Sequence, residues 1–247
     1  MKLLIVSSAD PIFMNMAKYM SGLIGDKHEV TIVREAPQIS ILKILKQRIK
    51  RAGVISGFSQ FSFKVFDVLF LRKGIAKDAE ERLLGYDCAE VSSINSEEAK
   101  NLASEFDVVI CIATSIIKQA TLDASKYGFI NVHSGILPHY RGTGNFWAVV
   151  NRDWENIGCT CHWMTSEIDV GRVVSITKIT DNFHTLWEMN NVAMLAGIDA
   201  LSKIINDGQL LDRCIELDES QSAYYSWFGI ADYIKFLRSM RHSRARR

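Results

Sequence analysis

Short apolar runs that alternate with helical stretches constrain the fold of this chain more than any other feature. Residues 2–7 form a continuous apolar run, and Asp10-Pro11 then supplies a helix cap followed by a proline suited to the first helical position. A second apolar run covers residues 29–33, and Asp107–Ile112 is the clearest buried strand. We therefore expect an α/β fold with a doubly wound, mostly parallel sheet, whose ligand crevice lies at the carboxyl ends of the strands.

The same signals predict the remaining elements. Further strands are expected at residues 89–94, 129–133, 157–164, 172–179 and 210–217, and helices at 11–23, after 95, at 146–151, at 185–207 and at 230–240. Residues 39–84 interrupt the alternation with apolar residues at helical spacing, which predicts two or three inserted helices. We assign residues 1–180 to a core that carries this insertion, and residues 181–247 to a helix that completes the core and a short C-terminal extension.

Composition excludes several broad classes of protein. The 247 residues are 48% hydrophobic and 23% charged, as in ordinary globular chains, and the net charge of +1 provides no overall field for nucleic acid. Five scattered cysteines make a disulfide framework improbable. The apolar start is too short for a signal peptide, and no unbroken run reaches the roughly 18 apolar residues of a membrane span. We expect a cytoplasmic protein without stable membrane insertion and without a nucleic-acid partner.

Three local motifs have competing interpretations. The loop Ser7–Pro11 lacks the glycines of a dinucleotide or phosphate-binding loop. In Cys159–His162 the two cysteines share one strand face and His162 points to the other, so we expect packing and no metal site. The basic stretch Lys43–Arg51 suits either an anionic membrane or a solvated helix face, and we favour the solvated face, as we do for the basic tail Arg241–Arg247.

One set of polar residues suggests chemistry. Asn131 and His133 lie two residues apart at a predicted strand end, so their side chains project to the same side. Asp169 lies in a turn that ends in a glycine, between two predicted strands, and could meet them. An imidazole, a carboxylate and an amide form a plausible acyl-transfer set. A surface histidine and a turn aspartate remain the alternative, so the residues alone indicate only acyl or proton chemistry.

Residues 129–174 also resemble the signature of the formyltransferases that use 10-formyltetrahydrofolate. The matching motifs are Asn-x-His at 131–133, Leu-Pro at 137–138, Arg-Gly at 141–142, Gly-x-Thr-x-His at 158–162 and Asp-x-Gly at 169–171. The separation of 36 positions between His133 and Asp169 (169 − 133) is the one that the family implies. Ser134-Gly135 departs from the Pro-Ser or Ala-Ser that commonly follows the histidine, which leaves the shape of this loop open.

The resemblance implies a Rossmann-like formyltransferase fold, 10-formyltetrahydrofolate as cosubstrate, no metal, and a homodimer. By position, Asn131, His133 and Asp169 match the catalytic residues of the family. The positions implied for binding the folate are Thr114, Ser115, Ile116, Ile117, Leu137, Thr165 and Ile168. Those expected to bind the second substrate are Ser8, Asp10, Tyr140, Arg141 and Gly142.

The acceptor amine is the least determined part of the prediction. The tRNA enzymes of the family have a C-terminal β-barrel, for which the 67 residues after residue 180 (247 − 180) leave little room. The purine-pathway enzymes have a glycine-rich loop after the first strand, which is absent here. We therefore expect a nucleotide-linked amino sugar of surface-glycan biosynthesis, such as that of lipopolysaccharide O-antigen. Methionyl-tRNA, another small amine, water in a formyltetrahydrofolate hydrolase, and a binding module without activity stay as alternatives.

Overall fold

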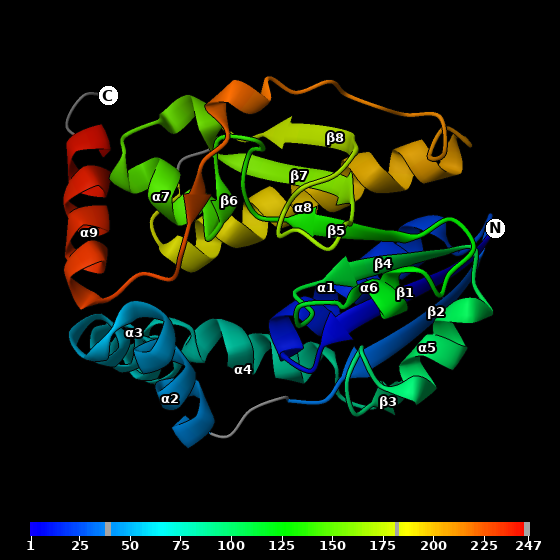
Figure 1. Cartoon of the computed structure of the whole chain (residues 1–247), viewed down its shortest axis with the longest axis horizontal. Coiled ribbons are helices and arrows are strands. Elements are labelled where there is room, and N and C mark those ends of the chain that lie inside the picture. Colours follow the sequence, from blue (N-terminus) through cyan, green and yellow to red (C-terminus); the bar gives the residue numbers. More distant parts are fainter. Residues whose placement is uncertain (38–40, 181–182, 245–247) are drawn as a thin grey trace.

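A computed structural model describes residues 1–37, 41–180 and 183–244. At its centre lies a seven-stranded sheet with the strand order β3-β2-β1-β4-β5-β7-β8 (Figure 1). Neighbouring strands from β3 to β5 are parallel, and β7 runs antiparallel to both β5 and β8. The strands are β1 (Lys2–Ser8), β2 (Glu29–Glu35), β3 (Ala89–Val91), β4 (Val108–Ile112), β5 (Phe129–His133), β7 (Gly158–Trp163) and β8 (Val173–Lys178). The predicted doubly wound, mostly parallel sheet is confirmed.

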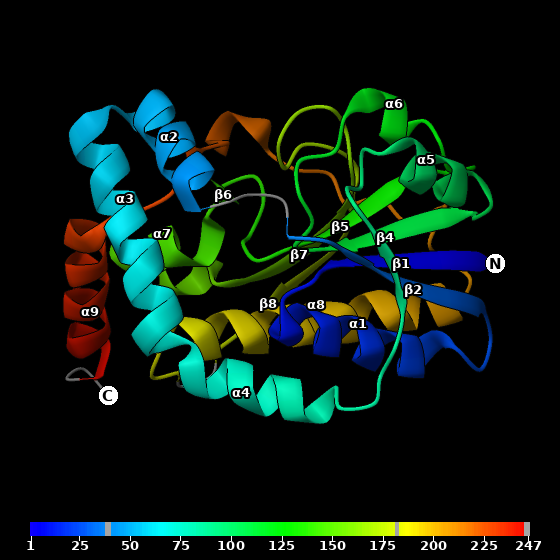
Figure 2. The same ribbon diagram turned by 90° about the horizontal axis from the view of Figure 1, so that it is seen from below.

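Helices cover both faces of the sheet, which is why its central strands are continuously apolar (Figure 2). The helices α1 (Pro11–Ile24), α4 (Lys73–Arg82) and α8 (Leu186–Asn206) lie on one face, and α5 (Glu97–Ser104) and α6 (Gln119–Leu122) on the other. Asp10 caps α1 by accepting the amide hydrogen of Ile12 at 3.1 Å, as the sequence predicts.

Helix α8 approaches the sheet closely at Gly197. A Cβ atom at this position would lie 2.2 Å from the Sγ of Cys159. Cys159 and Cys161 are fully buried on this side of β7, and the Sγ of Cys161 lies 3.6 Å from the carbonyl oxygen of Gly197. The two cysteines therefore pack against α8, whereas His162 faces the opposite side.

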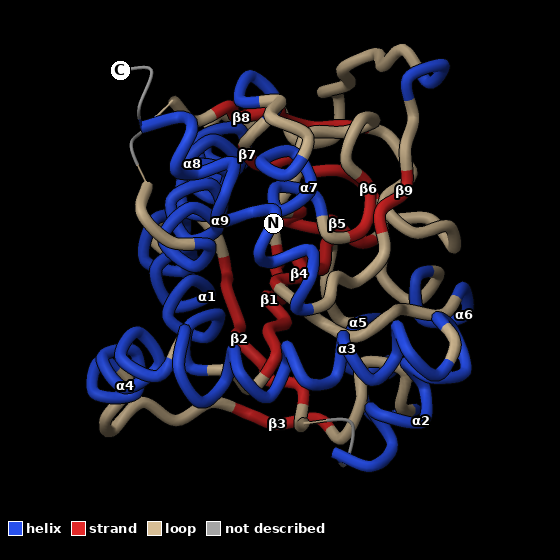
Figure 3. Tube along the Cα trace, turned by 90° about the vertical axis from the view of Figure 1, so that its left-hand side faces the viewer, coloured by secondary structure: helices blue, strands red, loops and turns tan. Residues whose placement is uncertain are grey.

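The inserted helices are present and belong to the same body as the sheet. They are α2 (Ile41–Ala52), α3 (Val54–Phe66) with a π-helical turn (Asp67–Leu71), and α4, while residues 39–40 lie outside the described range. Phe63 of α3 is buried with Phe228, at 4.8 Å between ring centroids, and Trp187 donates to the carboxylate of Asp67 at 2.6 Å. Near α3 lie α7 (Gly144–Val150) and α9 (Ile230–Arg244), at one end of the sheet (Figures 1 and 3).

Some predictions of individual elements are wrong or incomplete. Residues 210–217 form a turn with one isolated bridge, between Ile215 and Val173, because Leu210 is buried in the core and the segment runs along the edge of β8 instead of extending the sheet. The helix α6 and the parallel pair formed by β6 (Arg141–Gly142) and β9 (Tyr224–Tyr225) were not predicted. Two short 3-10 turns, Trp154–Asn156 and Glu219–Gln221, complete the described elements.

Candidate active site

The end of β5 brings the three predicted catalytic residues together. Asn131 and His133 point to one side of β5, and Asp169 lies in the loop between β7 and β8 with a φ of 52°. One carboxylate oxygen of Asp169 lies 3.4 Å from Nδ1 of His133 and 3.3 Å from Nδ2 of Asn131. The other oxygen accepts the amide hydrogen of Gly142 at 2.7 Å. Asp169 thus contacts two side chains of β5, although it lies 38 positions after Asn131 in the sequence.

A fourth polar side chain, His162, belongs to this cluster and was not predicted as a site residue. Its Nε2 lies 3.4 Å from Nδ2 of Asn131 and 3.8 Å from Asp169, and its Nδ1 donates to the carbonyl oxygen of Trp163 at 3.0 Å. His162 is directly opposite Asn131 in the antiparallel pair of β5 and β7. The signal was the strand alternation, which already placed His162 on the face opposite the cysteines.

The carboxylate and the imidazole have shifted pKa values. Burial raises the pKa of Asp169, but the charge of His133, the nearby ring of His162 and the hydrogen bond from the amide of Gly142 outweigh this effect and bring the pKa to about 2. Burial lowers the pKa of His133 below 6.5, although Asp169 and the carbonyl of Tyr140 act in the opposite direction. At neutral pH the site therefore combines an ionised carboxylate with a neutral imidazole.

The tautomer of His133 follows from its second contact. Nε2 lies 2.9 Å from the carbonyl oxygen of Tyr140, and a carbonyl only accepts, so Nε2 carries the hydrogen. Nδ1 is then the basic atom, and it faces Asp169. A Cβ atom at Gly135 would lie 2.7 Å from this Nε2, so the glycine that departs from the family pattern leaves room for the ring.

Hydrogen bonds from Thr160 of β7 hold the loop after β5 in place. The Thr160 hydroxyl donates to the carbonyl of Gly135 at 2.8 Å and accepts the amide hydrogen of Leu137 at 3.1 Å. Leu137 itself is buried beneath the loop. Tyr140 is buried as well, and its hydroxyl donates to Asp153 at 2.9 Å. These two predicted binding residues therefore offer the site backbone groups and packing, and their side chains point elsewhere.

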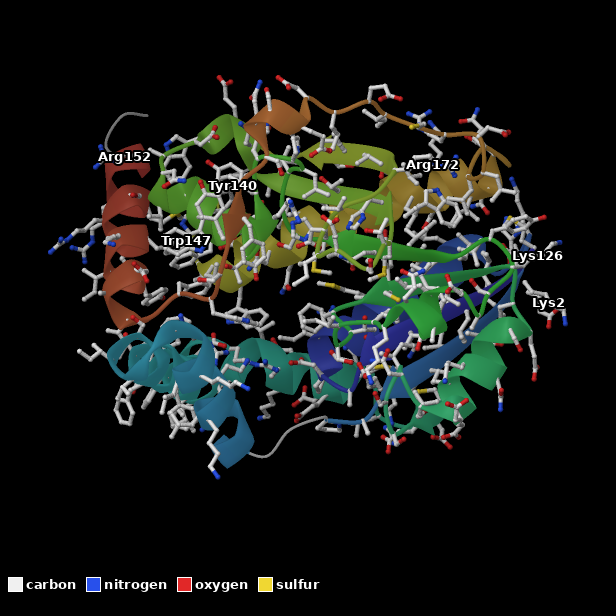
Figure 4. The ribbon with its side chains drawn as sticks, in the orientation of Figure 1. Lys2, Lys126, Tyr140, Trp147, Arg152 and Arg172 are labelled. Carbon is white, nitrogen blue, oxygen red and sulfur yellow. The ribbon has the colours of Figure 1, made fainter. Side chains whose placement is uncertain are left out.

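Arg141 joins the two loops that carry the site. Its guanidinium donates to the carbonyl oxygen of Ile168 at 2.8 and 3.0 Å, directly before Asp169. Next to it, the side chains of Tyr140 and Trp147 lie near α7, and Tyr225 is stacked between them at 5.3 and 5.5 Å (Figure 4). The Arg141 contact thus positions the loop of Asp169, a role that the sequence did not predict.

The loop predicted to bind the folate begins beside the catalytic residues, because Cys111 pairs with Asn131 in the sheet. Buried Glu35 accepts the amide and hydroxyl hydrogens of Ser115 at 2.8 and 2.6 Å. Asn95 donates to the carbonyl of Ile116 at 2.9 Å. Thr114 is partly exposed, Ile116, Thr165 and Ile168 are exposed, and Ile117 is buried. Glu35 and Asn95, which fix this loop, carried no signal in the local sequence.

A cavity of about 440 Å³ lies at the carboxyl ends of β1, β2 and β4. It is lined by Ser8, Ala9, Asp10, Glu35, Ala36, Pro37, Ala113, Thr114 and Ser115. Asp10 is already occupied, because it caps α1 and forms an ion pair with Arg72 of the inserted segment. The buried Oγ of Ser8 has no hydrogen-bond partner among the described residues. In the described ranges no group of three His, Cys, Asp or Glu side chains is arranged to hold a metal ion.

The chain is similar to several known proteins. The chain is 33% identical over 131 residues to a methionyl-tRNA formyltransferase from Finegoldia magna, a match that covers 51% of this chain and 42% of that protein. The chain thus spans less than half the length of the curated relatives it matches.

Two solved structures share the fold at low identity. A sugar N-formyltransferase from a Shewanella species is 16% identical, with a TM-score of 0.61 over 97% of this chain and 88% of that one. An N-formyltransferase from Helicobacter canadensis, solved with folinic acid and dTDP-3-aminofucose, is 15% identical, with a TM-score of 0.54 over 92% and 71%.

The profile of the formyl transferase family matches residues 59–188, which include β5, β7 and the whole polar cluster. This match also extends into the inserted helices, further than the motif resemblance reached. Because it covers more than half of the 247 residues, the chain belongs to the formyl transferase family.

Proposed function

We propose that this chain transfers a formyl group from 10-formyltetrahydrofolate to the primary amine of a nucleotide-linked amino sugar, as a cytoplasmic step of surface-glycan biosynthesis. The observation that carries the proposal is that Asn131 and His133 both contact the carboxylate of Asp169, in a chain of the formyl transferase family. The donor supplies a carbonyl carbon bonded to a folate nitrogen.

His133 accepts the proton in this proposal. An amine that attacks a carbonyl must lose a proton as the new C–N bond forms, and the folate nitrogen must gain one as the old bond breaks. The lowered pKa of His133 keeps its ring neutral at pH 7, and Nδ1 is its basic atom. Asp169, 3.4 Å away, stabilises the imidazolium that forms. The same imidazolium then returns the proton to the leaving nitrogen.

Asn131 donates to the carbonyl oxygen as it gains negative charge. Its Nδ2 makes two long hydrogen bonds, of 3.3 Å to Asp169 and 3.4 Å to His162. Long bonds are weak, so exchanging one of them for an oxyanion costs little. Because His162 and Asp169 fix the orientation of the Asn131 amide, its N–H group is already oriented before the reaction begins.

The loops around the cluster suit a flat, partly apolar donor. Exposed Ile116 and Ile168 extend from two loops whose backbones are held by Asn95 and Arg141. An aromatic ring that covers these side chains removes apolar surface from water without having to order the loops first. Thr114, Ser115 and Thr165 are the neighbouring polar groups of the proposed folate site.

Exposed aromatic side chains support a nucleotide-linked acceptor. Tyr224 and Trp227 lie on the segment that pairs with Gly142, whose amide holds Asp169. Aromatic rings bind nucleobases by stacking. The cavity lined by Ser8 and Asp10 provides a second subsite at the end of β1, and the absence of glycine there argues against a phosphate bound by the loop itself.

The test is a transfer assay with 10-formyltetrahydrofolate and a panel of nucleotide-linked amino sugars. We expect release of tetrahydrofolate that depends on the acceptor, and a product heavier than the acceptor by one formyl group. Release without an acceptor would indicate a hydrolase. No release with any acceptor, from a protein that binds the folate, would indicate a binding module.

Methionyl-tRNA is a second candidate acceptor, because the curated relatives at about one third identity carry that name. The same assay with charged initiator tRNA separates the two. Formylation of the tRNA at a higher kcat/KM than that of any amino sugar would replace the proposed acceptor and leave the proposed mechanism intact.

A further inference from the structure

The outer face of α3 and its π-helical turn is apolar and open to solvent. Ile55 is 88% exposed, Phe58 58% and Phe70 69%, and Val65 and Leu69 are exposed as well. Large apolar side chains gathered in one exposed patch are unusual on a monomer and indicate an interaction surface. The whole stretch Val54–Leu71 has a mean hydropathy of 1.4 and is only 22% buried.

Four of these exposed residues form one stripe, which half-buried Phe61 and Ser62 interrupt in the middle. Residues 55, 58, 65 and 69 follow helical spacing, so their side chains lie on the same side of the helix. The opposite side is attached to the protein by Phe63, which is buried under Phe228, and by Asp67, which accepts from Trp187. The helix therefore has one face fixed to the fold and one face without a described partner.

The helix that packs beside this stripe is basic. The sequence of α2 contains five cations and no acid: Lys43, Lys46, Arg48, Lys50 and Arg51. The guanidinium of Arg48 lies over the ring of Trp227, 4.7 Å from its centroid, so we base the inference on the lysines. Lys46 and Lys50 are exposed and lie one turn apart. The two helices are in close contact, because a Cβ atom at Gly57 would lie 2.5 Å from the backbone nitrogen of Ile49. Figure 1 shows α2 and α3 at the border of the molecule, away from the sheet.

We propose that the α2–α3 surface docks the protein onto an anionic membrane. An apolar stripe beside cations is the composition of helices that lie in the lipid headgroup region, where apolar burial and attraction to anionic lipids add together. A symmetric contact between two copies of the chain would instead place the cations of α2 near those of the second copy, where they repel one another. An anionic membrane surface attracts the same cations. This role goes beyond formyl transfer and does not depend on it.

The helix lies on the membrane and does not cross it. By length and composition Val54–Leu71 is long and apolar enough to span, although the sequence contains no unbroken apolar run of that length. Crossing would remove Asp67 from Trp187 and Phe63 from its aromatic cluster. A buried carboxylate without its partner is costly in hydrocarbon, so the fixed face keeps the helix parallel to the surface.

The experiment is vesicle flotation with the full chain. Vesicles of phosphatidylcholine alone are compared with vesicles that contain phosphatidylglycerol as well. We expect binding to the anionic vesicles that weakens as the salt concentration rises from about 0.1 M to about 1 M, where the Debye length falls from ~10 Å to ~3 Å. The variant K46E/K50E should bind at least roughly 25-fold more weakly, at about fivefold per lost cation.

The apolar stripe is tested by I55S/F58S, with L23S/L84S as the matched control, because Leu23 and Leu84 are exposed apolar residues elsewhere on the surface. The first variant should lose vesicle binding and the second should retain it, both with the unfolding midpoint of the wild type. Equal binding to neutral and anionic vesicles, or none to either, would overturn the proposal. So would a dimer, seen by sedimentation, that I55S/F58S abolishes, because a second copy would then occupy the stripe.

Discussion

Asp169 connects the loop between β7 and β8 to two other parts of the chain. Its two oxygens contact a histidine and an amide from β5 and a backbone N–H from β6. It also has a φ of 52°, a conformation that non-glycine residues rarely adopt, so the surrounding contacts hold it there. A carboxylate with a pKa of about 2 stays charged throughout the physiological range.

Replacing Asp169 by asparagine tests this role. The amide keeps the size of the side chain but removes the charge that stabilises the His133 imidazolium. We expect kcat/KM for formyl transfer to fall by about 10²- to 10⁴-fold while the Kd for the folate changes little. Glu167→Gln, two positions away on the exposed side of the loop, is the control. A loss below about tenfold in D169N would contradict the proposed stabilisation.

The pKa of His133 predicts the pH dependence of the reaction. Its pKa lies below 6.5, so the basic form is the majority at pH 7 and becomes protonated only in more acidic solution. We expect kcat/KM to be flat near neutrality and to fall as the pH drops through the lowered pKa. Measuring kcat/KM from pH 5 to 8 checks this, and an acid limb centred above pH 6.5 would show that another group is titrating.

At the residue scale, the sequence predicted three polar side chains that come together at the end of β5. Strand alternation placed Asn131 and His133 on one side, and the motif resemblance added Asp169. His162 was not predicted as a site residue, because only the pairing of β5 with β7 places it opposite Asn131. Glu35 was missed because a buried acid at a strand end has no local pattern.

Elements were predictable where one signal dominated. The buried strands and α8 have strong patterns and appear where expected, whereas β6 and β9 are two residues each and pair across more than eighty positions. Such short strands depend on tertiary contacts and leave no periodicity to read. The strand predicted at residues 210–217 is absent, because this segment packs at the edge of β8 with a single bridge and does not join the sheet.

The contact between α8 and β7 leaves no room for one extra methyl group. Gly197→Ala would place a Cβ atom 2.2 Å from the sulfur of buried Cys159, so we expect a loss of about 1–3 kcal/mol in the free energy of unfolding. Gly22→Ala in α1, where no atom lies within 4 Å, should gain about 0.5–1 kcal/mol. Urea unfolding of both variants tests this, and equal stabilities would contradict the close packing.

The ion pair between Asp10 and Arg72 connects the insertion to the start of α1. Both side chains are mostly buried, and Asp10 also caps α1. Arg72→Met should therefore cost about 1–3 kcal/mol, because it leaves a poorly solvated carboxylate without its cation. Lys77→Met removes an exposed pair with Glu81 on the same helix and should change stability by less than about 0.5 kcal/mol. Similar losses in both variants would indicate that burial does not distinguish the two pairs.

At the scale of the whole molecule, the insertion is a part of the fold that sequence patterns could not place. The helices of residues 39–84 were expected, but nothing in their sequence indicated that Phe63 joins Phe228 or that Asp67 holds Trp187, more than one hundred positions away. These contacts bury one face of α3 and leave the other face open. The exposed stripe is therefore a consequence of tertiary packing.

The buried His133 and Asp169 make the stability of the whole molecule depend on pH. In the unfolded chain His133 titrates at its ordinary pKa of 6.5, but folding lowers that value, so below pH 6.5 the unfolded state binds a proton that the folded state does not. The free energy of unfolding therefore falls as the pH decreases through 6.5. Asp169 titrates at 3.8 when unfolded and about 2 when folded, so its contribution is complete above 3.8 and is lost between 3.8 and 2.

Urea unfolding between pH 7.5 and 4.5 measures the first of these two steps. We expect the wild type to lose stability below pH 6.5, with a contribution from His133 of at most about 1.4 kcal/mol per pH unit. His133→Asn should remove most of that slope whatever its effect on absolute stability, whereas His184→Asn, at an exposed histidine, should leave it. A slope that persists in H133N would mean that the acid sensitivity comes from another buried group, and that the ring of His133 is not held neutral by the fold.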